Sequence, residues 1–106
     1  MQMHHIRYFL ALCEDLNFTR AARRCGVSQP SLTNAISDLE QELGGPLFQR
    51  KPQIGLTALG RAVWPHLKQI EHCENAAREA AQSTLRQIAR ASQAAPVAHQ
   101  AQEPIV

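Results

Sequence analysis

The stretch that decides the fold is FTRAARRCGVSQPSLTNAISDLEQELG, residues 18–44. Its first part, residues 19–25, predicts a two-turn helix, because Asn17 and Thr19 are both favourable N-cap residues. Gly26 follows this segment, and glycine is favoured just after a helix because it accepts a positive φ. A short helix followed by a tight turn is therefore expected here.

A second helix is expected directly after that turn. Ser28 can cap it, and Pro30 is tolerated in its first turn, where the missing N–H would have no intrahelical partner. Its buried face is formed by apolar residues at helical spacing, namely Leu32, Ile36, Leu39 and Leu43. A short helix, a glycine-containing turn and a helix with a polar leading face form a helix-turn-helix, which presents its second helix to the major groove of DNA. Many helix pairs are only packed cores, so this pattern by itself leaves both interpretations open.

The residues on the N-terminal side predict one more helix. Its apolar stripe has helical spacing and consists of Ile6, Phe9, Leu10, Cys13 and Leu16. This helix is expected to begin at Ile6 and to end near Leu16, with His4 and His5 at the surface.

On the C-terminal side, a small wing and a long helix are expected. Two short β-capable runs, Leu47–Arg50 and Ile54–Leu56, predict a two-stranded wing. Thr57 can cap a helix over residues 58–93, which are rich in the good helix formers Ala, Arg, Glu and Gln. Pro65 lies inside this helix and should bend it.

The predicted fold is therefore mainly α, a winged helix-turn-helix followed by a long helix. The final residues contain Pro96 and Pro104 and show no periodicity, so they are expected to form a disordered tail. The expected divisions of the chain are a winged helix-turn-helix domain over 1–57, a linker helix over 58–93 and the tail over 94–106.

Length and composition exclude several classes of protein. The chain has 106 residues, which suits one small domain and makes a multi-domain enzyme unlikely on size alone. Three widely spaced cysteines do not form a disulfide framework, and a reducing cytoplasm suits them best. The longest apolar run, residues 8–13, is too short to cross a membrane. We therefore expect a cytoplasmic protein without a membrane partner.

The motifs of this chain resemble those of a known family, the LysR-type transcriptional regulators. The residues that carry the resemblance are Phe18-Thr19-Arg20-Ala21-Ala22, Val27-Ser28-Gln29-Pro30-Ser31-Leu32, Leu47-Phe48-Gln49-Arg50 and Leu56-Thr57-Ala58-Leu59-Gly60. The resemblance runs from about His5 to Leu67 and concerns the DNA-binding module of the family. It implies a winged helix-turn-helix and a linker helix that pairs two subunits. The effector-binding domain of the family would follow the linker helix, so no small-molecule effector site is expected within these residues.

Candidate DNA-binding residues follow from the helix-turn-helix pattern and from the resemblance to the family. Gln29 can bond bidentately to a base edge, best to adenine, and short polar groups suit base edges or phosphates. The candidates on the second helix of the motif and its cap are Ser28, Gln29, Pro30, Ser31, Thr33 and Asn34. Candidate phosphate contacts are Arg20, Arg50 and Lys51, with Arg23 and Arg24 on the same helix as Arg20. The resemblance implies that Arg50 lies near the DNA backbone, while for the other four cations a solvated surface role is an equal alternative.

The charge of the predicted domain is low. Six cations face five anions over residues 1–57, a net charge of +1. Family members often carry basic residues where this chain has Asn34, Ser37 and Asp38. Affinity is therefore expected to be modest and to depend on dimerisation, because fewer phosphate contacts release fewer counterions.

A heptad-like seam on the long helix predicts a homodimer. Its members are Val63, Leu67, Ile70, Ala77, Ala81 and Ile88, and Glu74 interrupts it. A two-fold dimer presents two identical recognition helices, so the expected target is double-stranded DNA with an interrupted inverted repeat. The alternative is a protein that heterodimerises with full-length relatives and modulates them without binding DNA strongly itself.

Metal, cofactor and enzyme interpretations have little support in the sequence. His66, His72 and Cys73 share one helix, but adjacent residues point about 100° apart and the ligand spacing of a tetrahedral site is absent. No catalytic motif or phosphate-binding glycine loop is present. Cys25 is expected to be a small buried hydrophobe rather than a redox sensor. We therefore expect no enzyme activity, no metal and no cofactor.

Overall fold

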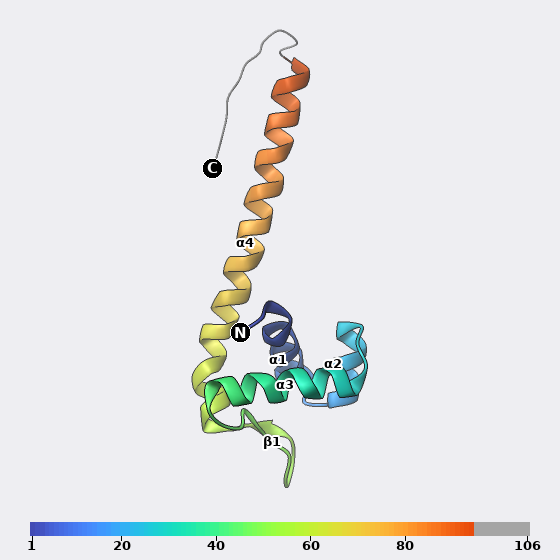
Figure 1. The fold of residues 1–106 in the computed structure, drawn as a ribbon, viewed down its shortest axis with the longest axis vertical. Helices are drawn as coiled ribbons and strands as arrows, with labels where there is room; N and C mark the ends of the chain where they lie inside the picture. The colour runs from blue at the N-terminus through green and yellow to red at the C-terminus, as the bar shows by residue number, and fades with distance from the viewer. Residues whose placement is uncertain (95–106) are drawn as a thin grey trace. The chain divides into compact units, whose positions relative to one another are not determined.

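The computed structural model describes residues 1–94 (Figure 1). Its elements in chain order are α1 (Met3–Asp15), α2 (Phe18–Cys25), α3 (Gln29–Leu43), β1 (Phe48–Gln49), β2 (Gly55–Leu56) and α4 (Ala58–Ala94). This is the mainly helical winged helix-turn-helix with a long final helix that the sequence predicted. Residues 95–106, nearly all of the predicted tail, lie outside the described residues.

The chain divides into two compact units. The first covers Met1–His72 and contains α1, α2, α3, the two strands and the first turns of α4. The second begins at Cys73 and contains the rest of the described part of α4.

Helices α1, α2 and α3 pack against one another and enclose the core of the first unit. The largest fully buried side chains are Phe9, Ile6, Leu12, Leu32, Ile36, Leu39 and Leu47. The rings of Phe9 and Phe48 lie 5.5 Å apart, so the first strand also packs onto α1. Most of the apolar residues predicted for the first and third helices are thus buried. Cys13 and Leu43 are only half-buried, and Leu16, which caps the end of α1 with a positive φ, is 40% exposed.

The position of Leu67 differs from the prediction that it belongs to the dimer seam. Its side chain is 3% exposed and belongs to the core of the first unit, and Val63 packs partly against the same core. Leu67 is therefore covered by its own chain and is not available to a partner helix. The sequence could not separate these possibilities, because an apolar residue every three or four positions marks a buried helix face whatever covers it.

The caps of the helix-turn-helix are built by side chains. The Asn17 side chain accepts a hydrogen bond from the backbone N–H of Arg20 at 2.8 Å, so Asn17 is the cap and α2 begins one residue earlier than predicted. Ser28 Oγ accepts from the backbone N–H of Ser31 at 3.2 Å and caps α3, as expected. Gly26 adopts a φ of 73°, which ends α2 in the left-handed conformation that glycine tolerates.

The start of α1 differs from the prediction. The helix begins at Met3, three residues before the apolar stripe, and His5 is buried rather than exposed. His5 precedes Phe9 by four residues and Leu12 by seven, so it lies on the core-facing side of the helix. The position of His5 on the helix, rather than the polarity of its side chain, therefore determines its burial.

The wing is short. Its strands are antiparallel, with Phe48 opposite Leu56 and Gln49 opposite Gly55. Each strand has two residues, fewer than the runs in the sequence that predicted them. Thr57 then accepts a hydrogen bond from the backbone N–H of Gly60 at 3.0 Å and begins α4, which continues through Pro65.

Candidate nucleic-acid interface

The cap and the first two turns of α3 present a group of exposed, mostly polar residues. The exposed members of the predicted site are Ser28, Gln29, Pro30, Ser31 and Asn34, while Thr33 is half-buried. They are exposed because the opposite side of α3 carries Leu32, Ile36 and Leu39, all 0% exposed. One helix face is therefore fixed in the core while the other is open to a ligand.

Two serines at this helix start are coupled to each other. Ser28 Oγ donates to Ser31 Oγ at 2.9 Å while it accepts from the Ser31 backbone N–H. Ser28 is thus primarily a capping residue, and the Ser31 hydroxyl keeps its own hydrogen for an acceptor outside the helix. The N–H groups of this turn also carry the positive end of the helix dipole, which favours a phosphate.

Gln29 has a partner that the sequence interpretation missed. Thr19 Oγ1, on α2, donates a hydrogen bond to Gln29 Oε1 at 3.1 Å. From the sequence, Thr19 was a possible cap and part of a family motif, with no contact to Gln29 expected. The predicted helix-turn-helix is the signal that could have indicated this contact, because it places α2 and α3 next to each other.

The wing carries the cations Arg50 and Lys51, both of them exposed. The guanidinium carbon of Arg50 lies 4.6 Å from the centre of the Phe18 ring, which is a cation–π distance. Phe18 is the first residue of α2, so this contact joins the wing to the helix-turn-helix. This role of Phe18 was not apparent from the sequence.

The three arginines of α2 differ in their surroundings. Arg24 pairs with Glu14 and with Asp15, both at 3.0 Å, and donates to the carbonyl oxygen of Ala11 at 3.3 Å. The hydrogen bond to Asp15 is the main reason why the pKa of Arg24 is raised. All three arginines are exposed, but Arg24 also links α2 to α1 through these contacts.

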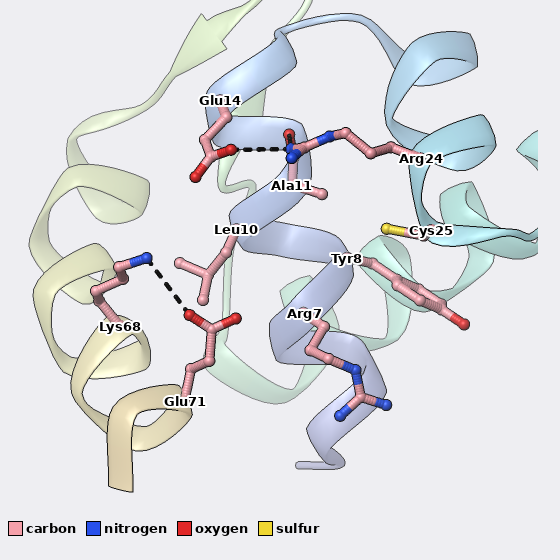
Figure 2. Close-up of a pocket in the computed structure, with 9 residues that line it drawn as sticks. All are labelled: Arg7, Tyr8, Leu10, Ala11, Glu14, Arg24, Cys25, Lys68 and Glu71. Atoms are coloured by element: carbon pink, nitrogen blue, oxygen red, sulfur yellow. Dashed lines mark hydrogen bonds and ion pairs between the residues drawn. The ribbon is translucent and has the colours of Figure 1, made fainter. Parts of the chain in front are cut away.

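A cleft of about 350 Å³ is lined by residues of α1, α2 and α4, among them Arg24, and by none of the candidates on α3 (Figure 2). Its charged lining includes Arg7, Arg24, Lys68, Glu14 and Glu71, and Lys68 lies 3.4 Å from Glu71. Figure 2 shows that the Glu14–Arg24 and Lys68–Glu71 pairs are made within the lining itself. Two of the three cations in the lining, Arg24 and Lys68, thus already have anionic partners.

Cys25 also borders this cleft, and its thiol is half-buried. Burial is the main reason why the pKa of Cys25 is raised, which favours the neutral thiol over the reactive thiolate. This environment agrees with the expectation of a small hydrophobe.

Over residues 1–94 no group of three His, Cys, Asp or Glu side chains is arranged to hold a metal ion. Within the same range, none of the helices has the length and apolar character needed to span a membrane.

The fold and the exposed first turn of α3 define a winged helix-turn-helix protein. Residues 3–61 match the profile of the family described as bacterial regulatory helix-turn-helix protein, lysR family. The match covers more than half of the chain, and the chain belongs to this family, which confirms the resemblance drawn from its motifs.

Individual relatives agree with this assignment. The chain is 48% identical over 68 residues to the HTH-type transcriptional regulator IlvR of Caulobacter vibrioides, covering 63% of this chain and 23% of that protein. It is 39% identical over 87 residues to the HTH-type transcriptional regulator BudR of Klebsiella aerogenes, covering 81% of this chain and 61% of that protein. This chain therefore matches only part of the length of each relative. Both relatives are transcriptional regulators and not enzymes, as predicted for this chain.

A solved structure matches the fold. The crystal structure of the CbnR DNA-binding domain in complex with DNA superimposes with a TM-score of 0.73 at 31% sequence identity. The match covers 80% of this chain and 99% of that domain. The fold predicted from the sequence, a LysR-type winged helix-turn-helix with a long final helix, is thus confirmed.

Proposed function

We propose that this chain binds double-stranded DNA sequence-specifically as a homodimer and thereby regulates transcription in the cytoplasm. The observation that carries the proposal is the exposed polar first turn of α3, held in place by the Ser28 cap and a buried opposite face. A helix with this exposure enters the major groove in helix-turn-helix proteins. The DNA complex of the similar CbnR domain supports the same role.

In this proposal Gln29 and Asn34 read base edges, and smaller groups of the same turn contact bases or phosphates. The remaining residues of α3 and its cap that take part are Ser28, Pro30, Ser31 and Thr33. Arg20, Arg50 and Lys51 are exposed and would neutralise phosphates, which position the protein without reading sequence.

The proposed dimer is formed by apolar residues of α4. Ile70 and Ile88 are 39% and 58% exposed, so α4 presents large apolar side chains that a partner helix can cover. Leu85 is 64% exposed, and we add it to the predicted seam because it lies one turn before Ile88. Ala77 and Ala81 continue the same seam, and Val63 lies at its edge. Two copies related by a two-fold axis would read an interrupted inverted repeat.

One observation favours a second candidate function. Asp38 is exposed on α3, with a side chain 64% exposed, and an anion on that helix repels phosphates. This feature suits a chain that pairs with full-length relatives through α4 and modulates them while binding DNA weakly itself.

Selection from a random duplex library with the purified 106-residue chain distinguishes the two functions. The proposed function predicts enrichment of an inverted repeat whose binding weakens steeply with salt. A folded dimer that enriches no sequence would contradict it and support the second candidate. Sedimentation equilibrium on the same sample reports whether the chain is a dimer.

A further inference from the structure

The contact between Thr19 and Gln29 joins the two helices of the helix-turn-helix at their N-terminal ends. Thr19 Oγ1 donates to Gln29 Oε1 at 3.1 Å, although ten residues and a turn separate the two. We infer that Thr19 is a specificity-determining residue that positions the Gln29 amide for base recognition. This inference rests on the proposed function and deepens it, since it assigns a role to a residue outside the recognition helix.

The backbones that carry the two side chains are held rigidly. The Asn17 cap fixes the first turn of α2, and Ala21 and Ala22 bury the helix against the core. The backbone N–H of Val27 then donates to the carbonyl oxygen of Ala22 at 3.0 Å, which closes the turn between the helices. Because neither backbone is free to drift, a hydrogen bond between the side chains restricts the side-chain angles of Gln29.

The chemistry of the amide determines what this restriction achieves. An amide oxygen has two acceptor sites and the amide nitrogen has two hydrogens. Thr19 occupies one acceptor site on Oε1, so the second acceptor site and both Nε2 hydrogens remain for DNA. A bidentate contact to adenine needs one acceptor for N6–H and one donor for N7, and the held amide still offers both.

The expected benefit is preorganisation. A glutamine side chain has several rotatable bonds and loses their freedom when it binds a base edge. The bond to Thr19 restricts these angles before DNA arrives and also resists rotation of the amide that would exchange its oxygen and nitrogen. Thr19 therefore sharpens the preference for one base pair, and it does so only through Gln29.

The test compares Thr19→Val, Thr19→Ser, Gln29→Ala and the double variant Thr19→Val/Gln29→Ala. Each is measured on the selected inverted repeat and on duplexes with the other base pairs at the position that Gln29→Ala relaxes. Valine keeps the shape of threonine but removes the hydroxyl, while serine keeps the hydroxyl. Thermal unfolding of each variant shows that the fold is retained.

Thr19→Val is expected to reduce the preference at the Gln29-dependent base pair by about two- to tenfold, as for the loss of one hydrogen bond. Thr19→Ser should keep the preference. The double variant should bind like Gln29→Ala alone, because without the amide the hydroxyl has nothing to position.

Two results would overturn the inference while leaving the proposed function intact. One is a Thr19→Val loss that is equal on all duplexes and adds to that of Gln29→Ala, which would assign the hydroxyl to a phosphate. The other is an unchanged base preference in Thr19→Val. If the wild-type chain itself shows no sequence preference, the proposed function fails and the inference fails with it.

Discussion

The guanidinium of Arg50 lies over the ring of Phe18, with its central carbon 4.6 Å from the ring centre. Arg50 follows the first strand of the wing, and Phe18 begins α2. The contact therefore connects the two parts of the proposed DNA-binding surface and restricts where the Arg50 charge can lie. A cation held this way retains its positive charge for a phosphate.

Replacing the ring tests this connection. Phe18→Leu keeps an apolar side chain but removes the cation–π contact, which is worth about 0.5–1 kcal/mol at an exposed site. We expect a two- to fivefold loss of affinity on random duplex DNA, by about the same factor for every sequence. Fluorescence anisotropy at fixed salt measures it, and Phe18→Tyr is the matched control that should bind normally. Equal losses in both variants would show that the ring matters only for packing.

Substitutions of Gln29 and Lys51 are expected to change DNA affinity in different ways. Gln29→Ala should weaken the free energy of binding by about 1–3 kcal/mol on the preferred site and by little on random DNA, because it removes a base contact.

Lys51→Ala should weaken binding on both DNAs and lower the salt slope by about 1, because it removes a phosphate contact. A salt series on both duplexes measures these effects. An equal loss on random DNA for Gln29→Ala would argue against base reading.

Ile70 tests the proposed dimer. Ile70→Glu places a charge on an exposed apolar position of α4, and we expect it to shift the chain from dimer to monomer. Sedimentation equilibrium measures the change, and the helical content should be retained. An unchanged dimer would mean that the interface lies elsewhere on the chain.

Leu67 is expected to behave in the opposite manner, although it lies only three residues before Ile70. Its side chain is buried within its own chain, so Leu67→Ala should lower the free energy of unfolding by about 2–5 kcal/mol. Chemical denaturation measures this loss at a protein concentration well above that needed for dimerisation. A fully stable variant that no longer dimerises would show that Leu67 belongs to the dimer interface.

The thiol of Cys13 provides a pH-dependent contribution to stability. Burial, with a smaller effect from the Glu14 carboxylate, raises its pKa from 9.0 to about 12. The unfolded chain therefore loses this proton first, so the contribution is complete below pH 9 and is lost as the pH rises from 9 toward 12.

Denaturation midpoints between pH 8 and pH 10.5 should fall more steeply for the wild-type chain than for Cys13→Ala. The comparison uses the slopes, because the substitution also changes packing at every pH. Parallel slopes for the two proteins would show that the thiol has an ordinary pKa in the folded state.

Much of the local structure could be predicted from single residues. Ser28 caps α3 and Gly26 ends α2 because each residue type satisfies a requirement of one helix end, and that requirement is local. The apolar spacing of α3 likewise identifies its buried face. The order of such signals along the chain was sufficient to predict a helix-turn-helix and a wing, and the resemblance of its motifs indicated the LysR family.

Contacts between distant residues could not be read in the same way. The ion pairs of Arg24 with Glu14 and Asp15 join two helices, and the sequence offered the same arginine to DNA with equal justification. The bond from Thr19 to Gln29 depends on the angle between α2 and α3. Such an angle results from the packing of the whole core and has no local signature.

The sequence by itself thus determined the helices and most of their caps and apolar faces, because these follow from backbone requirements and periodicity, and the family followed from the resemblance of its motifs. Only the tertiary structure decided what covers each apolar face and which polar groups meet. Leu67 and Ile70 show this difference, since both lie on one predicted seam, yet one is in the core and the other is exposed. Periodicity indicates which face of a helix is apolar, and only the packing of the whole chain determines which residues cover that face.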